Sequence, residues 1–251
     1  MSIWVTGDIH GHPVRLGTNS FPEQKEMTKE DCVIICGDFG LVWDRDGESC
    51  NEQYWLQWLE NKPFTTIFCD GNHENHKRLN SYPIKEWNGG KVHEIRPSVL
   101  HLMRGEIFNI CNKKIFTFGG AESHDISDGI LEYKDWRKNA KVLESLGKFM
   151  YRVKDLSWWE EEMPSEEEMQ NGRDNLEKNN WEVDYIVSHD CPASTQALIY
   201  IGNRDTNKLN VYLEEIKQKC NYTRWLFGHN HINKQVDEKD IALYEQIIRI
   251  A

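Results

Sequence analysis

The sequence predicts a mixed α/β fold, and two regularities of the chain support this prediction. Short, continuous apolar runs rich in β-branched residues are bounded by Gly, Asp or Asn, which is typical of strands buried on both faces. Amphipathic stretches with the spacing of surface helices lie between these runs. The chain has 251 residues, of which 39% are hydrophobic, and this is enough for one compact domain with a substantial core.

Six apolar runs are expected to form the core strands. In chain order they are Ile3–Thr6, Cys32–Cys36, Thr66–Cys69, Ile115–Phe118, Tyr185–Val187 and Trp225–Phe227. Two of the intervening stretches, Asn51–Asn61 and Asn207–Cys220, are expected to be surface helices because their large apolar side chains recur on one face. This alternation predicts a mixed α/β sheet.

Three further segments complete the expected organisation. Closely spaced strands are expected in Val92–Ile110 and in Lys234–Ile250, and they predict a second, more antiparallel sheet. Between them, Tyr133–Asn180 is charged and rich in Trp, and Pro164-Ser165 followed by three Glu residues is a typical helix start. We expect a helical insertion at about residues 133–180 within a single domain that spans residues 1–251.

The composition narrows the expected partners and location. The net charge of −11 disfavours a broad electrostatic grip on nucleic acid, so a small or locally bound substrate is expected. The seven cysteines form no C-x-x-C pair and are interpreted as reduced, mostly buried side chains. No apolar run approaches the roughly 20 residues of a membrane helix, and the chain starts without a basic and apolar leader. A cytoplasmic location without membrane contact is therefore expected, and the oligomeric state is left open.

Five short segments place Asp, Asn and His next to glycine directly after apolar runs. They are Gly7-Asp8-Ile9-His10-Gly11, Gly37-Asp38-Phe39-Gly40, Gly71-Asn72-His73-Glu74, Ser188-His189-Asp190 and Gly228-His229-Asn230-His231. Because α/β folds bind ligands at the carboxyl ends of their strands, these side chains are expected to meet at one sheet edge. Carboxylate and imidazole groups are ligands of Mn²⁺, Fe and Zn²⁺, and the lack of clustered cysteines argues against a structural zinc site. The segments predict a two-metal site that activates water.

Each segment taken alone has a simpler interpretation as a glycine-rich turn whose Asp or Asn caps a helix. For a single segment that interpretation is the stronger one. Together, however, the segments contain five of the ten histidines of the chain, which favours a shared functional site.

In this order the five segments resemble the motifs of the calcineurin-like metallophosphoesterase superfamily, and they extend from Asp8 to His231. The resemblance implies a four-layer α/β/β/α sandwich, with two mixed β-sheets face to face and the metal site at the carboxyl edge of the strands. It also implies a set of metal ligands: Asp8, His10 and His231 for one ion, Asn72, His189 and His229 for the other, and Asp38 as the bridge between them.

The same resemblance implies the chemistry. His73 would be the catalytic residue, because its ring would lie over the phosphoryl group and protonate the leaving oxygen without binding a metal. The implied cofactors are two divalent metal ions, Mn²⁺ first, with Fe, Zn²⁺ or Ni²⁺ as alternatives. The implied reaction is attack of a metal-bridging hydroxide on a phosphomonoester or phosphodiester in a phosphorylated small molecule or nucleotide. A nucleic-acid nuclease or repair phosphatase, and a non-catalytic metal-containing scaffold, are kept as alternatives.

The first and third motifs resemble most the branch of protein Ser/Thr phosphatases and dinucleoside tetraphosphatases, but the chain departs from that branch at two places. The branch has Gly-Asp-x-x-Asp-Arg-Gly, whereas here Asp38 is followed by Phe39-Gly40-Leu41-Val42. The branch also has Arg before Gly-Asn-His, where this chain has Asp70. Two arginines that grip phosphate are therefore missing, and so is the Asp that would orient His73.

Other residues close to the motifs have two interpretations each. Arg45 and Arg78 either replace the missing arginines or form surface ion pairs. His124 and Asp125 follow a strand in a glycine-rich loop, and either line the pocket or belong to a turn. The tryptophans near the motifs either stack on a nucleobase or pack in the core and a lid: Trp43, Trp158 and Trp159. Four histidines are interpreted as structural: His12, His76, His93 and His101.

Overall fold

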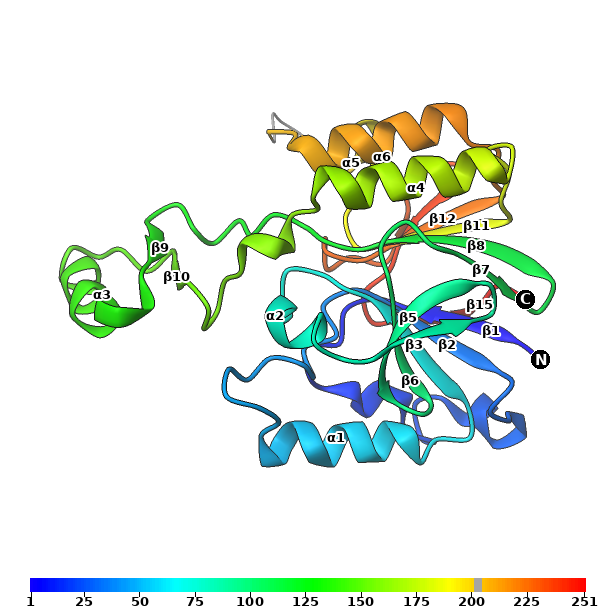
Figure 1. The fold of residues 1–251 in the computed structure, drawn as a ribbon, viewed down its shortest axis with the longest axis horizontal. Coiled ribbons are helices and arrows are strands. Elements are labelled where there is room, and N and C mark those ends of the chain that lie inside the picture. Colours follow the sequence, from blue (N-terminus) through cyan, green and yellow to red (C-terminus); the bar gives the residue numbers. More distant parts are fainter. Residues whose placement is uncertain (201–204) are drawn as a thin grey trace.

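The structure, a computed structural model, describes residues 1–200 and 205–251. Two β-sheets lie face to face, and helices cover both outer faces (Figure 1). One outer layer contains α1 (Cys50–Glu60), and the other contains α4 (Glu166–Lys178), α5 (Ala193–Ile199) and α6 (Lys208–Lys219). The four-layer α/β/β/α sandwich expected from the sequence is therefore confirmed.

Among the described residues, the first sheet has seven strands in the order β15-β1-β2-β3-β6-β5-β4. Its central strands are parallel, and antiparallel strands form both edges. The strand bounds are β1 (Ile3–Thr6), β2 (Cys32–Cys36), β3 (Thr65–Cys69), β4 (Ile84–Trp87), β5 (Gly90–Arg96), β6 (Val99–Leu102) and β15 (Ile247–Arg249).

The second sheet has six strands in the described part of the chain, in the order β13-β14-β12-β11-β8-β7. Its four central strands are parallel, and β13 and β7 pair antiparallel at the two edges. The bounds are β7 (Ile107–Ile110), β8 (Lys113–Phe118), β11 (Tyr185–Ser188), β12 (Arg224–Phe227), β13 (Lys234–Gln235) and β14 (Asp240–Ala242).

The expectation that Val92–Ile110 and Lys234–Ile250 form one second, more antiparallel sheet is wrong. Each segment is divided between the two sheets: β5 and β6 join the first sheet while β7 joins the second, and β13 and β14 join the second while β15 joins the first. Both segments supply edge strands. The physical reason is that alternation of apolar and polar residues identifies a half-buried strand but does not say which sheet it joins.

Side chains of the central strands are buried on both faces, which explains their continuous apolar runs. In β2, Val33 and Ile35 pack in the layer below the first sheet, together with Leu56 and Leu59 of α1. The alternate residues Ile34 and Cys36 pack between the sheets. A third apolar cluster joins the second sheet to its helices, with Met169 of α4 and Leu213 of α6 packed against Phe116 of β8 and its neighbours.

The helix starts follow the local sequence. At α1 the Ser49 hydroxyl accepts a hydrogen bond from Glu52 N, and the Glu52 carboxylate accepts one from Ser49 N. Ser165 and Glu168 form the same box at α4, where the sequence predicted a helix start.

No helix in residues 1–200 and 205–251 has the length and hydrophobicity needed to cross a membrane. The remaining helices are α2 (His76–Leu79), α3 (Trp136–Ser145) and the 3-10 turns Pro13–Leu16, Pro22–Glu26, Tyr133–Asp135 and Glu160–Glu162.

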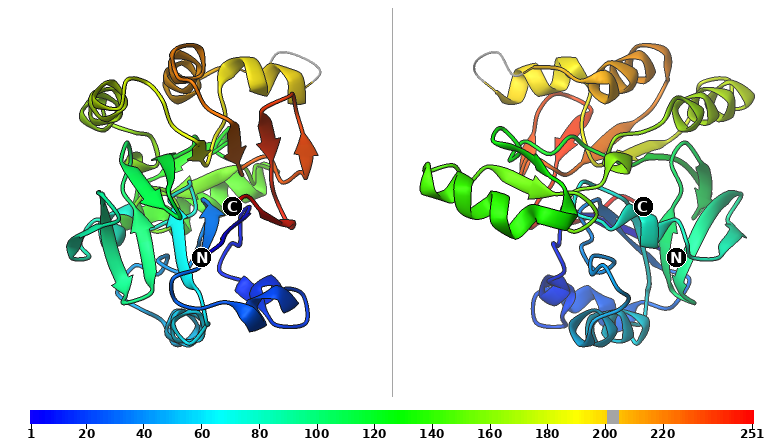
Figure 2. Two further views of the ribbon diagram at one scale, coloured as in Figure 1. Left: turned by 90° about the vertical axis from the view of Figure 1, so that its right-hand side faces the viewer. Right: turned by 60° about the vertical axis from the view of Figure 1, so that its left-hand side comes forward.

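Residues 126–158 form an arm that projects away from the sandwich (Figures 1 and 2). It contains α3 and a two-stranded parallel ribbon of β9 (Gly129–Leu131) and β10 (Tyr151–Val153). The expected insertion at about 133–180 thus contains two different parts, because α4 packs on the second sheet while α3 does not leave the arm. The return strand β10 brings the chain back to the carboxyl edge of the first sheet.

Candidate metal centre

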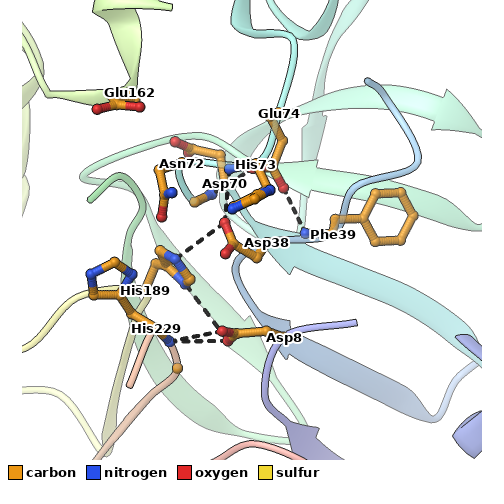
Figure 3. A network of polar contacts seen from close by, with 12 residues as sticks. Asp8, Asp38, Phe39, Asp70, Asn72, His73, Glu74, Glu162, His189 and His229 are labelled. Carbon is orange, nitrogen blue, oxygen red and sulfur yellow. Dashed lines mark hydrogen bonds and ion pairs between the residues drawn. The ribbon is translucent and has the colours of Figure 1, made fainter. Parts of the chain in front are cut away.

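Side chains from five strand ends converge at the edge where the two sheets meet (Figure 3). Asp8, Asp38 and Asn72 follow β1, β2 and β3 of the first sheet. His189 and His229 follow β11 and β12 of the second sheet. The convergence joins both sheets, because parallel strands present their carboxyl ends on the same side.

One group of four side chains is close enough to share an ion. The ligand atoms of Asp8, His10, Asp38 and His231 all lie within 4.8 Å of one another. His231 Nε2 is 3.1 Å from Asp8 Oδ2, and His10 Nε2 is 2.9 Å from His231 Nε2. His10 Nε2 is also 3.7 Å from Asp38 Oδ2. Carboxylate oxygens and imidazole nitrogens in this arrangement are suitable donors for Mn²⁺, Fe or Zn²⁺.

A second group lies on the other side of Asp38. Asn72 Oδ1 and His189 Nε2 are buried and have no hydrogen-bond partner among the described residues, although His189 Nε2 is 3.2 Å from Asp38 Oδ1. Buried polar atoms without partners are costly, and a cation between them would satisfy both. The ring of His229 lies further out, with its centroid 5.0 Å from that of His189. An amide oxygen and imidazole nitrogens are donor types that bind metal ions.

Hydrogen bonds orient several of these side chains. His189 Nδ1 lies 2.8 Å from the carbonyl oxygen of Cys36, which can only accept, so Nδ1 donates and Nε2 faces Asp38. The backbone N–H of His229 is shared between the two carboxylate oxygens of Asp8, with N–O distances of 3.0 and 3.1 Å. Burial alone would lower the pKa of His189, but Asp38 and Asp8 raise it to about 10. The carboxylates therefore favour a positive charge at this point, which a metal ion would supply in place of a proton.

The backbone is strained at four of the expected ligands. His10, Asp38, His229 and His231 have φ angles of 44°, 45°, 61° and 49°, a left-handed region that few residues other than glycine adopt. Such strain persists where the surrounding structure enforces it, and it is concentrated at functional sites. The strain thus supports a functional role for this strand-end geometry.

The chain matches the family model described as calcineurin-like phosphoesterase over residues 1–233. The chain belongs to this family. It is 23% identical over 222 residues to a lariat debranching enzyme of Danio rerio, covering 83% of this chain and 33% of that relative. It is 27% identical over 152 residues to lariat debranching enzyme A of Xenopus laevis, covering 55% of this chain and 27% of the relative. The aligned part is a third or less of the length of these relatives.

In this calcineurin-like phosphoesterase, His73 lies beside the expected metal ligands but outside the group of four. Its ring stacks on Trp43, with centroids 5.5 Å apart, and meets the ring of His10 edge-on at 4.7 Å. Its backbone N–H donates to Asp38 Oδ1 at 2.8 Å. Arg152 Nη2 donates to His73 Nε2 at 2.9 Å. Burial and, secondarily, Arg152 lower the pKa of His73 to about 4, although Asp38 acts in the opposite direction.

Arg152 therefore contacts the His73 ring where the phosphatase branch would have an Asp, and the sequence analysis gave Arg152 no role. Neither arginine considered there contacts the expected ligands. Arg78 pairs with Glu52 at 3.0 Å, and the Arg45 guanidinium lies 3.5 Å from the centre of the Tyr133 ring. Both arginines therefore have structural partners. Arg152 could not be found from a local pattern, because it is 79 residues from His73 in the sequence.

The glycine-rich loop at residues 119–125 approaches the site. The ring centroids of His124 and His229 are 4.9 Å apart, and Asp125 forms an ion pair with Arg152 at 2.6 Å. In the same loop, Ser123 Oγ accepts a hydrogen bond from Asn72 Nδ2 at 3.4 Å. The loop therefore belongs to the surroundings of the expected ligands.

Two buried glutamates support the site, and the sequence analysis assigned neither of them a role. Glu74 accepts hydrogen bonds from Phe39 N at 2.6 Å and Gly71 N at 3.0 Å, so it joins two of the motif segments (Figure 3). Burial, together with Asp38 and Asp70, raises the pKa of Glu74 to about 8. Glu162 accepts from Ser123 N, Ser123 Oγ and Trp158 Nε1, and burial raises its pKa to about 7.

On the far side of Asp70 lies a separate cavity of about 750 Å³, lined by His76, His93, His101 and Arg104 among others. Asp70 accepts from Arg104 Nε at 3.0 Å and from His101 Nε2 at 3.1 Å. His101 Nδ1 in turn lies 2.9 Å from His93 Nδ1. Asp70, which stands where the phosphatase branch has an arginine, is thus fully engaged in a buried ion-pair network.

Proposed function

We propose that this chain is a metal-dependent hydrolase of phosphomonoester or phosphodiester bonds that uses a dinuclear centre. The observation that carries the proposal is the convergence of Asp8, His10, Asp38 and His231, whose ligand atoms lie within 4.8 Å of one another. The unpartnered, buried Asn72 Oδ1 and the strained backbone at the strand ends support it. Membership of the calcineurin-like phosphoesterase family supplies the reaction class.

In the proposed assignment, Asp8, His10 and His231 hold one ion, and Asn72, His189 and His229 hold the other. Asp38 lies between the two groups, 3.7 Å from His10 Nε2 and 3.2 Å from His189 Nε2, and would bridge them. When bound, two divalent ions supply Lewis acidity and lower the pKa of a water molecule between them. Mn²⁺ is the first choice, with Fe, Zn²⁺ and Ni²⁺ as alternatives.

His73 would protonate the leaving oxygen. Trp43 and His10 fix the plane of its ring, and the hydrogen bond from Arg152 shows that Nε2 is an acceptor in this structure. With a pKa near 4 the ring is neutral at pH 7. A bound phosphoryl group would bring negative charge next to Nε2, and this charge favours the protonated ring that a general acid requires.

The favoured substrate is a phosphorylated small molecule or a nucleotide, since the net charge of −11 disfavours a long nucleic acid. A second candidate is a phosphodiesterase that acts on a branched substrate, and the similarity to two lariat debranching enzymes favours it. A panel of nucleotides, dinucleotides, phosphoproteins and linear or branched oligonucleotides would distinguish these classes.

The test of the proposal uses protein stripped of metal and reconstituted separately with Mn²⁺, Fe²⁺, Zn²⁺ or Ni²⁺. Elemental analysis should give close to two equivalents, and p-nitrophenyl phosphate or its bis ester should be hydrolysed only by reconstituted protein. Binding of two ions without turnover of any panel substrate would favour the non-catalytic scaffold. Turnover unaffected by chelators would contradict the metal-dependent mechanism.

A further inference from the structure

The guanidinium of Arg152 is buried beside the proposed metal centre. Arg152 lies in β10 and is only 6% exposed. Nη1 donates to the carbonyl oxygens of Asn72 and Ser157, each at 3.3 Å, and Nη2 donates to His73 Nε2 at 2.9 Å. Nε is 2.6 Å from Asp125 Oδ1. The arm thus places a cation against two residues of one motif.

These partners leave one N–H of the buried guanidinium without an acceptor among the described residues. A guanidinium stays protonated at all physiological pH values, and a buried charge is costly unless it is paired. Nε is satisfied by Asp125, whose side chain is 45% exposed but whose pairing atom Oδ1 is buried. The acceptor of Nη2 is a neutral ring nitrogen. Nη2 carries two N–H groups, and His73 is its one acceptor among the described residues.

The other arginines around the strand ends have acceptors within the protein. Arg15 donates to the carbonyl oxygens of Asp8 and Tyr244. Arg104 is paired with Asp70 and Glu168. Neither is bonded to an expected catalytic or ligand side chain. Arg152 differs because it donates directly to His73, next to the point where the reacting group would lie.

We infer that Arg152 binds a phosphoryl oxygen of the substrate and replaces the phosphate-gripping arginines that the strand-end motifs lack. This inference rests on the proposed function. A phosphoryl oxygen is a stronger acceptor for a guanidinium than a neutral imidazole nitrogen, because the hydrogen bond is then charge-assisted at both ends. The second N–H of Nη2 is available to this oxygen while the first stays on His73 Nε2. The arm, and not a strand end, thereby supplies the phosphate ligand.

The experiment compares wild type with Arg152→Gln and Arg152→Lys, all reconstituted with Mn²⁺. Inorganic phosphate binding is measured by calorimetry, metal content by elemental analysis, and kcat and KM with p-nitrophenyl phosphate or its bis ester. Arg152→Gln should keep both ions but raise the Kd for phosphate by about 10- to 100-fold, the usual worth of hydrogen bonds to a charged group. The Kd of Arg152→Lys for phosphate should fall between those of wild type and Arg152→Gln, because lysine keeps the charge but lacks the planar set of N–H donors.

A matched control separates phosphate binding from anchoring of the arm. Lys77 on α2 forms an ion pair with Asp155 of the arm at 2.6 Å, away from Arg152. Lys77→Glu places like charges at this contact and loosens the arm without touching Arg152. Phosphate affinity should be unchanged in Lys77→Glu. An equal loss of affinity in Lys77→Glu and Arg152→Gln would assign Arg152 to anchoring and overturn the inference.

Phosphate binding also separates this inference from the proposed function. If reconstituted wild type binds phosphate but hydrolyses no ester, the proposed function fails while the comparison of Kd values still tests Arg152. Unchanged phosphate affinity in Arg152→Gln overturns the inference whatever the turnover, and so does wild-type protein that binds two ions but no phosphate. If circular dichroism shows that Arg152→Gln is unfolded, the Kd of Arg152→Lys for phosphate decides whether Arg152 binds the phosphoryl group.

Discussion

A Cβ atom on Gly71 would overlap with the carboxylate oxygen Oδ1 of Asp38 and with the ring of His189. The backbone of one motif thus passes directly against the side chains of two others. Ligand side chains must be held within about 0.5 Å of the productive geometry, so the glycine is required by contact and not by a special φ angle. The Gly-Asn-His-Glu motif begins with glycine because the site leaves no room for a side chain.

We therefore expect Gly71→Ala to displace Asp38 or His189, and a displacement of about 1 Å is sufficient for a roughly 10²-fold loss of activity. Metal content should fall together with turnover. Gly147→Asn is the control, because Gly147 has φ +72° and nothing within 4 Å of its built Cβ, and Asn tolerates this backbone conformation. A fully active Gly71→Ala protein with two ions would show that the site adapts to the methyl group.

Asp38→Asn should be the most damaging single change among the expected ligands. Asp38 lies between the two groups, and a bridging carboxylate fixes the separation of the ions. We expect the variant to retain less than two equivalents of metal and to lose turnover more than any other ligand variant. Asp46→Asn serves as the control, since the side chain of Asp46 is 94% exposed. Near-wild-type turnover and metal content in Asp38→Asn would disprove the bridging assignment.

Ser123 connects a proposed ligand to the chain that follows the arm. Asn72 Nδ2 donates to Ser123 Oγ at 3.4 Å, and Ser123 Oγ donates to Glu162 Oε2 at 2.6 Å, which leaves Asn72 Oδ1 free for an ion. Ser123→Ala should weaken binding of the second ion by roughly 10- to 100-fold, the usual effect of losing an outer-shell partner. Metal titration followed by calorimetry measures this, with the exposed Ser145→Ala as control. If Ser123→Ala bound each ion as tightly as wild type does, the orienting role of Ser123 would be excluded.

The side chains that converge at the strand ends could be predicted from the sequence because each motif is local. Asp8 and His10 are two residues apart and follow an apolar run. Asn72 and His73 are adjacent and also follow an apolar run. Because the central strands are buried on both faces, they could be recognised in the sequence as continuous apolar runs. The ends of these strands fix where the motifs meet.

The surrounding residues could not be found in this way. Arg152 and Glu162 come from a segment whose path depends on how the arm leaves and rejoins the sandwich, and no short spacing connects them to Asn72 or His73. The strands of residues 92–110 and 234–250 were assigned to one sheet, although they divide between two, for a related reason. Their pairing is decided by tertiary packing, whereas their alternation is only a local property.

Stability should decrease as the pH falls from about 6.5 to 4, and His93 should contribute to this decrease. Asp70 can only accept, so His101 donates to it from Nε2, and His101 Nδ1 lies 2.9 Å from His93 Nδ1. Burial and the neighbouring His101 lower the pKa of His93 to about 4. Between pH 6.5 and 4 the unfolded imidazole binds a proton that the folded one does not, so acid favours unfolding in this window.

Urea denaturation of metal-free protein at several pH values measures this effect. His93→Asn removes the titrating group and keeps a polar side chain beside His101, so the free energy of unfolding should depend less on pH between 6.5 and 4 than in wild type. His12→Asn is the control, because His12 is exposed. The same pH dependence in wild type and His93→Asn would show that His93 does not titrate in this window.

His73 provides the last prediction, because it is the motif histidine assigned to proton transfer and not to metal binding. Adjacent residues that leave a strand point in different directions, and Asn72 presents its Oδ1 to the site while the His73 ring packs on Trp43 and bonds to Arg152. His73→Asn should keep both ions and the fold. Turnover of an alkyl phosphate should fall by roughly 10²–10⁴-fold, the usual contribution of a positioned acid. The loss should be smaller for p-nitrophenyl phosphate, whose leaving group hardly needs a proton. Loss of an ion from His73→Asn, or equal rate losses for good and poor leaving groups, would assign His73 to another role.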